Sequence, residues 1–278
     1  MLLSACFMPS FGVFLLLIAV SAMGQFEFYS LLRQAGIPSF RLVGVACGTA
    51  LIAATFFTTG GQGGELGSAY KWEHFVLVVS LIAMFVRQFP QKNNPMPLQT
   101  IGCTLLGIWY VPYLFNFFTR LCFAGSSGRD GSWLHIADTG RILCIYVVAV
   151  VKCGDIGAYF TGRTFGRHKL FPRISPAKTW EGLAGGIALS VVASVGFAIV
   201  GGNRLGAIAL PTVHAVALGL LLSVIGVVGD MFESLLKRAA GAKDSSALIP
   251  GMGGILDVLD SLLFGAPVLY VYMRVFLV

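Results

Sequence analysis

Eight long apolar runs constrain the fold of this chain more strongly than any other feature of its sequence. A helix of about 20 apolar residues crosses the roughly 30 Å hydrocarbon core of a bilayer. Hydrophobic residues make up 56% of the 278 residues and charged residues only 11%, against about 25% charged residues in soluble domains. The sequence therefore predicts an all-α, polytopic integral membrane protein with about eight transmembrane helices. The apolar runs lie near residues 9–31, 41–59, 73–89, 98–119, 139–161, 180–201, 207–229 and 256–277.

The first and third runs differ from the others. The first lacks a basic segment before it and continues into Gln25, Glu27 and Arg33, so we interpret it as a retained helix rather than a signal peptide. The third is short, and we expect it to tilt or to lie partly in the interface. No internal repeat or linker is visible. We therefore predict a single membrane domain over residues 1–278, with helices 1–4 in residues 1–140 and helices 5–8 and the motif-bearing loops in residues 141–278.

Lysine and arginine residues predict the orientation of the helices, because loops rich in them stay on the cytoplasmic side. The loops after helices 1, 3, 5 and 7 are the basic ones, so we expect them to face the cytoplasm with both chain ends outside. The loop between helices 4 and 5 is an exception, with Arg120, Arg129 and Arg141. The loop after helix 5 is the most basic of all; it carries Arg163, Arg167, Lys169, Arg173 and Lys178.

The net charge of +7 is largely this topological signal. No basic face with interleaved aromatic residues appears outside the apolar runs, so nucleic acid is not an expected partner. Some of the cations are instead expected to attract anionic lipid headgroups. The six Cys residues form no CxxC pair, which predicts neither a disulfide framework nor a zinc site.

The tract from Gly154 to Gly186 combines an acid, several glycines and a polar turn. Asp155 stands near the inner end of helix 5, where lipid contact would be costly, so it should face the bundle interior or water. Further on, Pro176 should break a helix and Thr179 can cap the next one. A hydroxyl and an ammonium just before a helix start, Ser175 and Lys178, are typical of a phosphate cradle. A charged topological loop before a capped helix explains this tract about as well.

Acidic residues gather late in the chain. Four of the seven Asp residues are Asp230, Asp244, Asp257 and Asp260, and they alternate with Lys237, Arg238 and Lys243 around a Gly-rich turn. Carboxylates at a membrane face are costly unless something binds them. The obvious partners are a divalent metal and a polyphosphate, which favours phosphoryl-type chemistry at a membrane surface.

The late tract resembles the signature of the phosphatidate cytidylyltransferase (CDP-diacylglycerol synthase) family. The Asp155 tract, through GAYFTGRTFG to SPAKTWEG, is similar to the middle segment of that family. Met252 stands where the family pattern has His, and Val258 where it has Arg. Family members usually begin with an extra hydrophobic segment, which we expect this chain to lack. The residues that match the signature in register are Ser234, Lys237, Arg238, Lys243, Asp244, Pro250, Gly251, Gly253, Gly254, Asp257 and Asp260.

The resemblance implies a reaction in which phosphatidate and CTP give CDP-diacylglycerol and pyrophosphate. It also implies Mg²⁺ with K⁺ as a second ion, a homodimer, and an active site on the cytoplasmic face of a bacterial inner membrane. The attacking phosphate oxygen is already ionised at neutral pH, so the reaction does not require a general base at position 252.

On this basis the catalytic residues are expected in helices 5–8. Asp257 and Asp260 share a face at the start of helix 8, and Asp230, Glu233 and Lys237 share a face if helix 7 continues past the membrane. We hypothesise that Asp230 and Asp257 ligate the metal, that Asp260 ligates or orients, and that Lys237 assists catalysis. Capping of helix 8 is the alternative for Asp257 and Asp260, and Glu233 is expected to be solvated or structural. The expected substrate-binding residues are Asp155, Ser175, Lys178, Arg238, Lys243, Asp244, Gly253 and Gly254.

Two other functions remain open. The first is a related CTP-dependent enzyme that acts on a polyprenol or an ether lipid. The second is an ion-coupled membrane transporter with Asp155, Asp230 and Asp257 along its pathway. Transporters tend to show repeated halves and acids at mid-membrane depth, whereas the acids here stand at helix ends, so the transporter ranks low.

Overall fold

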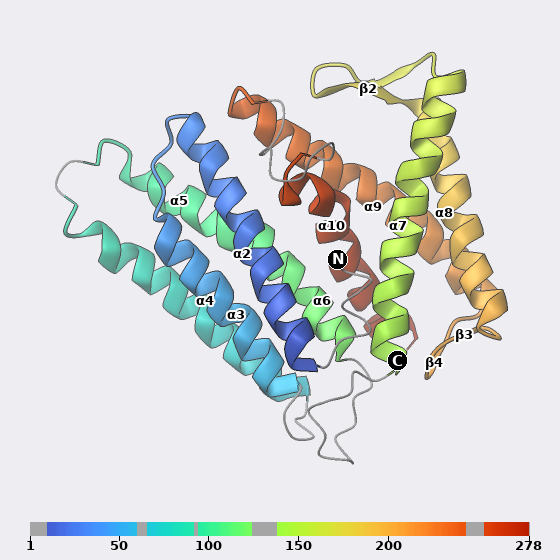
Figure 1. Ribbon diagram of the computed structural model, residues 1–278, viewed down its shortest axis with the longest axis horizontal. Coiled ribbons are helices and arrows are strands. Elements are labelled where there is room, and N and C mark those ends of the chain that lie inside the picture. The colour runs from blue at the N-terminus through green and yellow to red at the C-terminus, as the bar shows by residue number, and fades with distance from the viewer. Residues whose placement is uncertain (1–9, 60–65, 92–93, 124–137, 243–252, 278) are drawn as a thin grey trace. The chain divides into compact units, whose positions relative to one another are not determined.

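The computed structural model describes residues 10–59, 66–91, 94–123, 138–242 and 253–277 (Figure 1). These residues form helices and two short β-hairpins. The helices are α2 (Ser10–Gln34), α3 (Arg41–Thr59), α4 (Leu66–Gln88), α5 (Pro97–Ile108), the π-helical turn η1 (Trp109–Tyr113), α6 (Leu114–Cys122), α7 (Asp138–Phe165), α8 (Trp180–Val200), α9 (Thr212–Ala239) and α10 (Ile255–Phe276). The strands are β1 (Lys169–Phe171), β2 (Ser175–Thr179), β3 (Arg204–Leu205) and β4 (Ile208–Ala209).

Seven helices in the described part of the chain are long and apolar enough to cross a membrane. The predicted all-α, polytopic membrane fold is thus confirmed. The third apolar run does form a helix, α4, but this helix carries Lys71, Glu73 and Arg87 and is not among the seven. The seven spans are Phe11–Gln34, Arg41–Thr59, Pro97–Cys122, Thr139–Phe165, Trp180–Val200, Thr212–Ala239 and Ile255–Phe276.

The chain folds as two compact units. The first comprises Met1–Ile136 and Leu236–Val258, and the second comprises Ala137–Leu235 and Leu259–Val278. Helices α9 and α10 therefore each contribute to both units. The single membrane domain stays a prediction.

The first unit has an aromatic core and a buried polar cluster. Phe14 of α2 stacks on Phe56 of α3 with ring centroids 4.2 Å apart. In the cluster, Glu73 of α4 forms an ion pair with Arg120 of α6, and its Oε1 accepts hydrogen bonds from Thr55 at 2.5 Å and Asn116 at 3.1 Å. Because an isolated charge in an apolar interior is costly, these contacts allow Glu73 to be only 1% exposed.

Helices α7 and α8 of the second unit lie side by side along most of their length (Figure 1). Small residues allow this close contact: a Cβ added at Gly186 of α8 would lie 2.9 Å from the carbonyl oxygen of Gly154 in α7. Ser190 of α8 donates to the carbonyl oxygen of Val150 at 2.9 Å, which satisfies its hydroxyl within the apolar interface.

The antiparallel hairpin β1–β2 connects α7 to α8, with Lys169 opposite Thr179. Thr179 is the N-cap of α8, and its side chain accepts a hydrogen bond from the Gly182 amide at 3.1 Å. The predicted helix break and cap are therefore confirmed. Gly162 of α7 packs against this cap, since a Cβ there would lie 3.2 Å from the hydroxyl oxygen of Thr179.

The packing of α7 on α8 predicts that Gly186→Ala destabilises the protein. The added methyl group would press on backbone, which cannot rotate away, so we expect a loss of about 1–3 kcal/mol in the free energy of unfolding. Thermal unfolding in detergent measures this loss.

Gly196→Ala is the matched control on the same helix, because nothing lies within 4 Å of a Cβ at that position. Its free energy of unfolding should change by no more than about 1 kcal/mol. Equal effects of the two substitutions would contradict the close contact of α7 and α8.

Candidate metal centre

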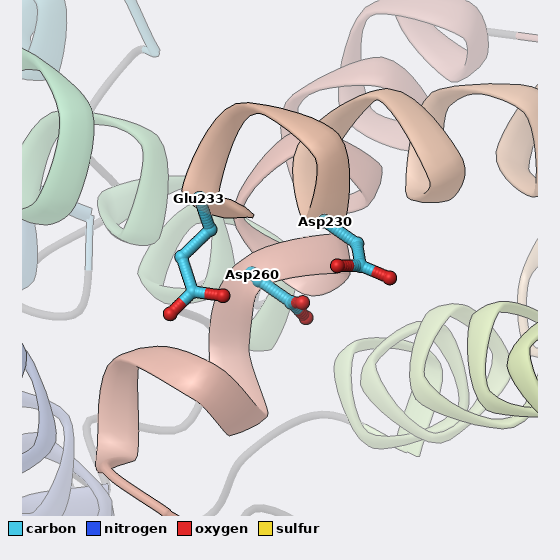
Figure 2. A group of neighbouring side chains, drawn as sticks. All are labelled: Asp230, Glu233 and Asp260. Carbon is cyan, nitrogen blue, oxygen red and sulfur yellow. The ribbon is translucent and has the colours of Figure 1, made fainter. Parts of the chain in front are cut away.

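Three carboxylates of the second unit come together where α9 and α10 meet. Asp230 and Glu233 come from α9 and Asp260 from α10, and one oxygen of each lies within 4.8 Å of the others (Figure 2). Glu233 is 1% exposed and Asp260 8%, whereas the Asp230 side chain is 35% exposed. Three acids this close and this buried repel one another, so the group favours a bound cation. We call these three residues the acidic group.

The sequence of α9 explains how the acidic group forms. Helix α9 continues to Ala239, which is the condition we set for a shared face, so Asp230 and Glu233 lie one turn apart on one face. Gly229 contacts α10 directly, since a Cβ there would meet the carbonyl oxygen of Asp260 and the ring of Phe264. The two backbones can therefore approach closely enough for short acidic side chains to meet.

Lys178 of the β1–β2 hairpin contacts the acidic group. Its ammonium lies 2.6 Å from Asp230 Oδ2 and 3.4 Å from the carbonyl oxygen of Val227. The structure thus brings together Lys178 and Asp230, two of the predicted site residues that lie far apart in the sequence. Ser175, the other half of the predicted cradle, is a half-buried residue at the start of β2, opposite Phe171.

Asp155 belongs to a second polar cluster in the same unit. Its Oδ2 accepts hydrogen bonds from Lys152 at 3.0 Å and from Ser261 at 3.1 Å, and Lys152 also donates to Ser261 at 3.1 Å. Ser261 directly follows Asp260 of the acidic group. Sequence reasoning did not single out Lys152, although its spacing of three residues from Asp155 in an apolar run is a detectable signal.

In the first unit, Asp257 and Lys237 form a pair. Lys237 Nζ lies 2.7 Å from Asp257 Oδ1, and Asp257 Oδ2 accepts a hydrogen bond from the Gly254 amide at 2.7 Å. Gly253 has a φ of +83°, and a Cβ there would lie 2.5 Å from Asp257 Oδ2. A residue with a side chain would therefore disturb this turn. These contacts agree with the helix-capping alternative for Asp257, and its role as a metal ligand stays a prediction.

Arg238 is an exposed residue in the last turn of α9. Lys243, Asp244 and Met252 lie outside the described residues. Val258 is a half-buried residue of α10.

Glu233 was expected to be solvated or structural rather than a ligand. It is almost fully buried, so it is not solvated. It belongs to the acidic group, and its role as a metal ligand is a proposal. Its spacing from Asp230 was visible in the sequence. What the sequence could not provide was the position of Asp260 beside them.

The fold and the acidic group define an integral membrane protein with a candidate metal centre. The model of the cytidylyltransferase family matches residues 1–276, and the chain belongs to that family. The predicted resemblance and the predicted class of enzyme, a nucleotidyltransferase, are confirmed.

Similar proteins cover most of the chain. It is 31% identical to the phosphatidate cytidylyltransferase of Bacillus subtilis (strain 168), over 93% of this chain and 88% of that protein. It is 33% identical to the phosphatidate cytidylyltransferase of Synechocystis sp., over 90% and 84% of the two chains. The phosphatidate cytidylyltransferase of Haemophilus influenzae is 42% identical over about half of each chain, 55% and 54%.

The acidic group predicts that Glu233→Gln weakens the binding of a divalent cation. The amide keeps the size of the side chain and removes one of three negative charges, so we expect at least about a tenfold rise in the dissociation constant for Mn²⁺. Titration calorimetry on the purified protein measures it.

Glu181→Gln is the control. Glu181 is a carboxylate of the same unit in the first turn of α8. It pairs with His168 and is not part of the acidic group. Its replacement should leave the affinity for Mn²⁺ unchanged. Unaltered binding in Glu233→Gln would remove Glu233 from the set of ligands.

Proposed function

We propose that this protein transfers the cytidylyl group of CTP to phosphatidate and releases pyrophosphate. The acidic group with Lys178 beside it is the observation that carries the proposal. Membership in the cytidylyltransferase family and nearly full-length similarity to two proteins named phosphatidate cytidylyltransferase support it.

The donor set of the acidic group fits Mg²⁺. All its ligands are carboxylate oxygens, and Mg²⁺ in proteins usually combines one or two carboxylates with waters and substrate phosphates. When bound, Mg²⁺ would supply positive charge to the phosphate oxygens of CTP. Asp230, Glu233 and Asp260 would hold it. Asp257 remains a further proposed ligand and K⁺ a proposed second ion.

The protein's own residues then have two tasks, which are to position the phosphates and to neutralise their charge. Lys178 already bonds to Asp230, and a phosphate oxygen of CTP is a competing acceptor for the same ammonium. Lys237 and Arg238 provide further cations on α9. A phosphatidate oxygen attacks the α-phosphorus, a new P–O bond forms, and the bond to pyrophosphate breaks in line. Because that oxygen is already ionised, no side chain has to remove a proton.

The proposal also includes the membrane, the orientation of the active site and the oligomeric state. We infer that the active site faces the cytoplasm, where CTP is available, and that the membrane is the bacterial inner membrane. The basic residues between α7 and α8 support this orientation. A homodimer is also proposed, on the family resemblance alone. Membership in the cytidylyltransferase family favours an enzyme over the transporter.

The proposal predicts that label from α-labelled CTP enters the lipid phase when the protein, phosphatidate and Mg²⁺ are combined in mixed micelles. Asp230→Asn should reduce this transfer by roughly 10²–10³-fold. The substitution removes a carboxylate that holds the cation, and the cation is what neutralises the charge on the reacting phosphates. Gly196→Ala, remote from the acidic group, should retain full transfer.

Two results would count against the proposal. If CTP binds in the presence of Mg²⁺ but phosphatidate receives no label, the lipid acceptor is a different one, such as a polyprenol phosphate or an ether lipid. If CTP does not bind at all, the protein is not a CTP-dependent transferase.

A further inference from the structure

The N-terminus of α10 receives its cap from a distant helix. The first amides of any α-helix lack acceptors within the helix, and the side chain of the preceding residue usually supplies one. Here that residue is Gly254, which has no side chain. The Ile255 and Leu256 amides donate instead to the two carboxylate oxygens of Glu27, at 3.0 and 2.8 Å. Glu27 belongs to α2.

The carboxylate of Glu27 is buried, so it depends on the amides of α10 for compensation. Glu27 is 3% exposed and lies within a membrane-spanning helix, where a carboxylate is costly unless it is well bound. Two charge-assisted hydrogen bonds at the positive end of the α10 dipole meet that cost. Both oxygens of Glu27 are engaged by the same turn, so the carboxylate fixes where α10 starts and how it is rotated.

The same turn carries residues of the proposed reaction. Asp257 accepts from the Gly254 amide, as the third helical residue does in a capping box, and it also bonds Lys237. Asp260 follows one turn later on the same helix. Each residue of an α-helix advances by about 1.5 Å and 100°, so a shift of the first turn by one residue would turn both carboxylates away from their present directions.

We propose that Glu27 is a positioning residue of the cytidylyltransferase: from α2, it sets the start of α10 and thereby the placement of Asp257 and Asp260. This inference rests on the proposed function. Glu27 touches neither substrate nor metal in this scheme, and it acts through the backbone of α10.

The first test measures amide hydrogen exchange in the peptide that contains Ile255 and Leu256. Glu27→Gln keeps the shape of the side chain but leaves one acceptor oxygen and no charge. We expect exchange of these two amides to become about tenfold faster, because a buried hydrogen bond is lost at the helix start. Exchange at the wild-type rate would overturn the cap. This readout does not depend on any activity.

The second test measures cytidylyl transfer as a function of Mg²⁺ concentration. If Glu27 positions the carboxylates, Glu27→Gln should raise the half-saturating Mg²⁺ concentration by about tenfold and lower turnover, with a smaller change in KM for CTP. Glu27→Asp keeps the charge on a shorter side chain and should recover part of the loss. Faster exchange with an unchanged Mg²⁺ requirement would reduce Glu27 to a structural cap and overturn its positioning role.

Gln25→Leu is the matched control. Gln25 is also a buried polar residue of α2, at 1% exposed, but it donates to carbonyl oxygens of Gly44 and Gly107. Its substitution should lower the melting temperature without changing exchange at Ile255 and Leu256 or the Mg²⁺ requirement. A wild-type protein that transfers no cytidylyl group would overturn the proposed function and the positioning role with it, whereas the exchange result would still decide the cap.

Discussion

The burial of carboxylates in a predominantly apolar protein is the constraint on which the rest of this structure depends. A charge removed from water destabilises the fold unless a partner compensates for its lost hydration. Glu73 has Arg120 with two hydrogen-bonding side chains, and Glu27 has the first amides of α10. In the acidic group, Lys178 forms an ion pair with Asp230, the most exposed of the three carboxylates. The protein itself compensates Glu73 and Glu27, and for the acidic group we propose a bound cation.

Small residues at helix contacts make these arrangements possible. In lipid, apolar side chains gain little from leaving the surrounding hydrocarbon, so helices associate through close packing and polar contacts. Gly186 allows α8 to lie against α7, and Gly229 allows α9 to lie against α10. The second of these contacts brings Asp230 and Glu233 of one helix to Asp260 of another. Packing of the helices and chemistry of the site therefore depend on the same positions.

Part of the candidate site was predictable from spacing along the chain. The cap at Thr179 follows from local rules, and so does the shared face of Asp230 and Glu233 once α9 continues past the predicted membrane run, as it does. Lys178 was expected to contact phosphate, and its contact with Asp230 could not be foreseen because β2 and α9 are far apart in the sequence. The burial of Glu233 could not be foreseen for a related reason: whether an acid on an amphipathic helix is solvated or buried depends on the helix that covers it.

The sequence by itself determined the membrane-spanning helices, the order of the motifs and the family, because apolar length, turn residues and motif spacing are properties of contiguous residues. Only the tertiary structure decided which carboxylates meet, that Ser261 of α10 joins Lys152 and Asp155 of α7, and that Glu27 caps α10. Each of these is a contact between separate segments, and its energy depends on distance and desolvation in three dimensions. Glu27 illustrates the difference most clearly, since the sequence shows an acid in an apolar helix and the structure shows the two backbone amides that stabilise it there.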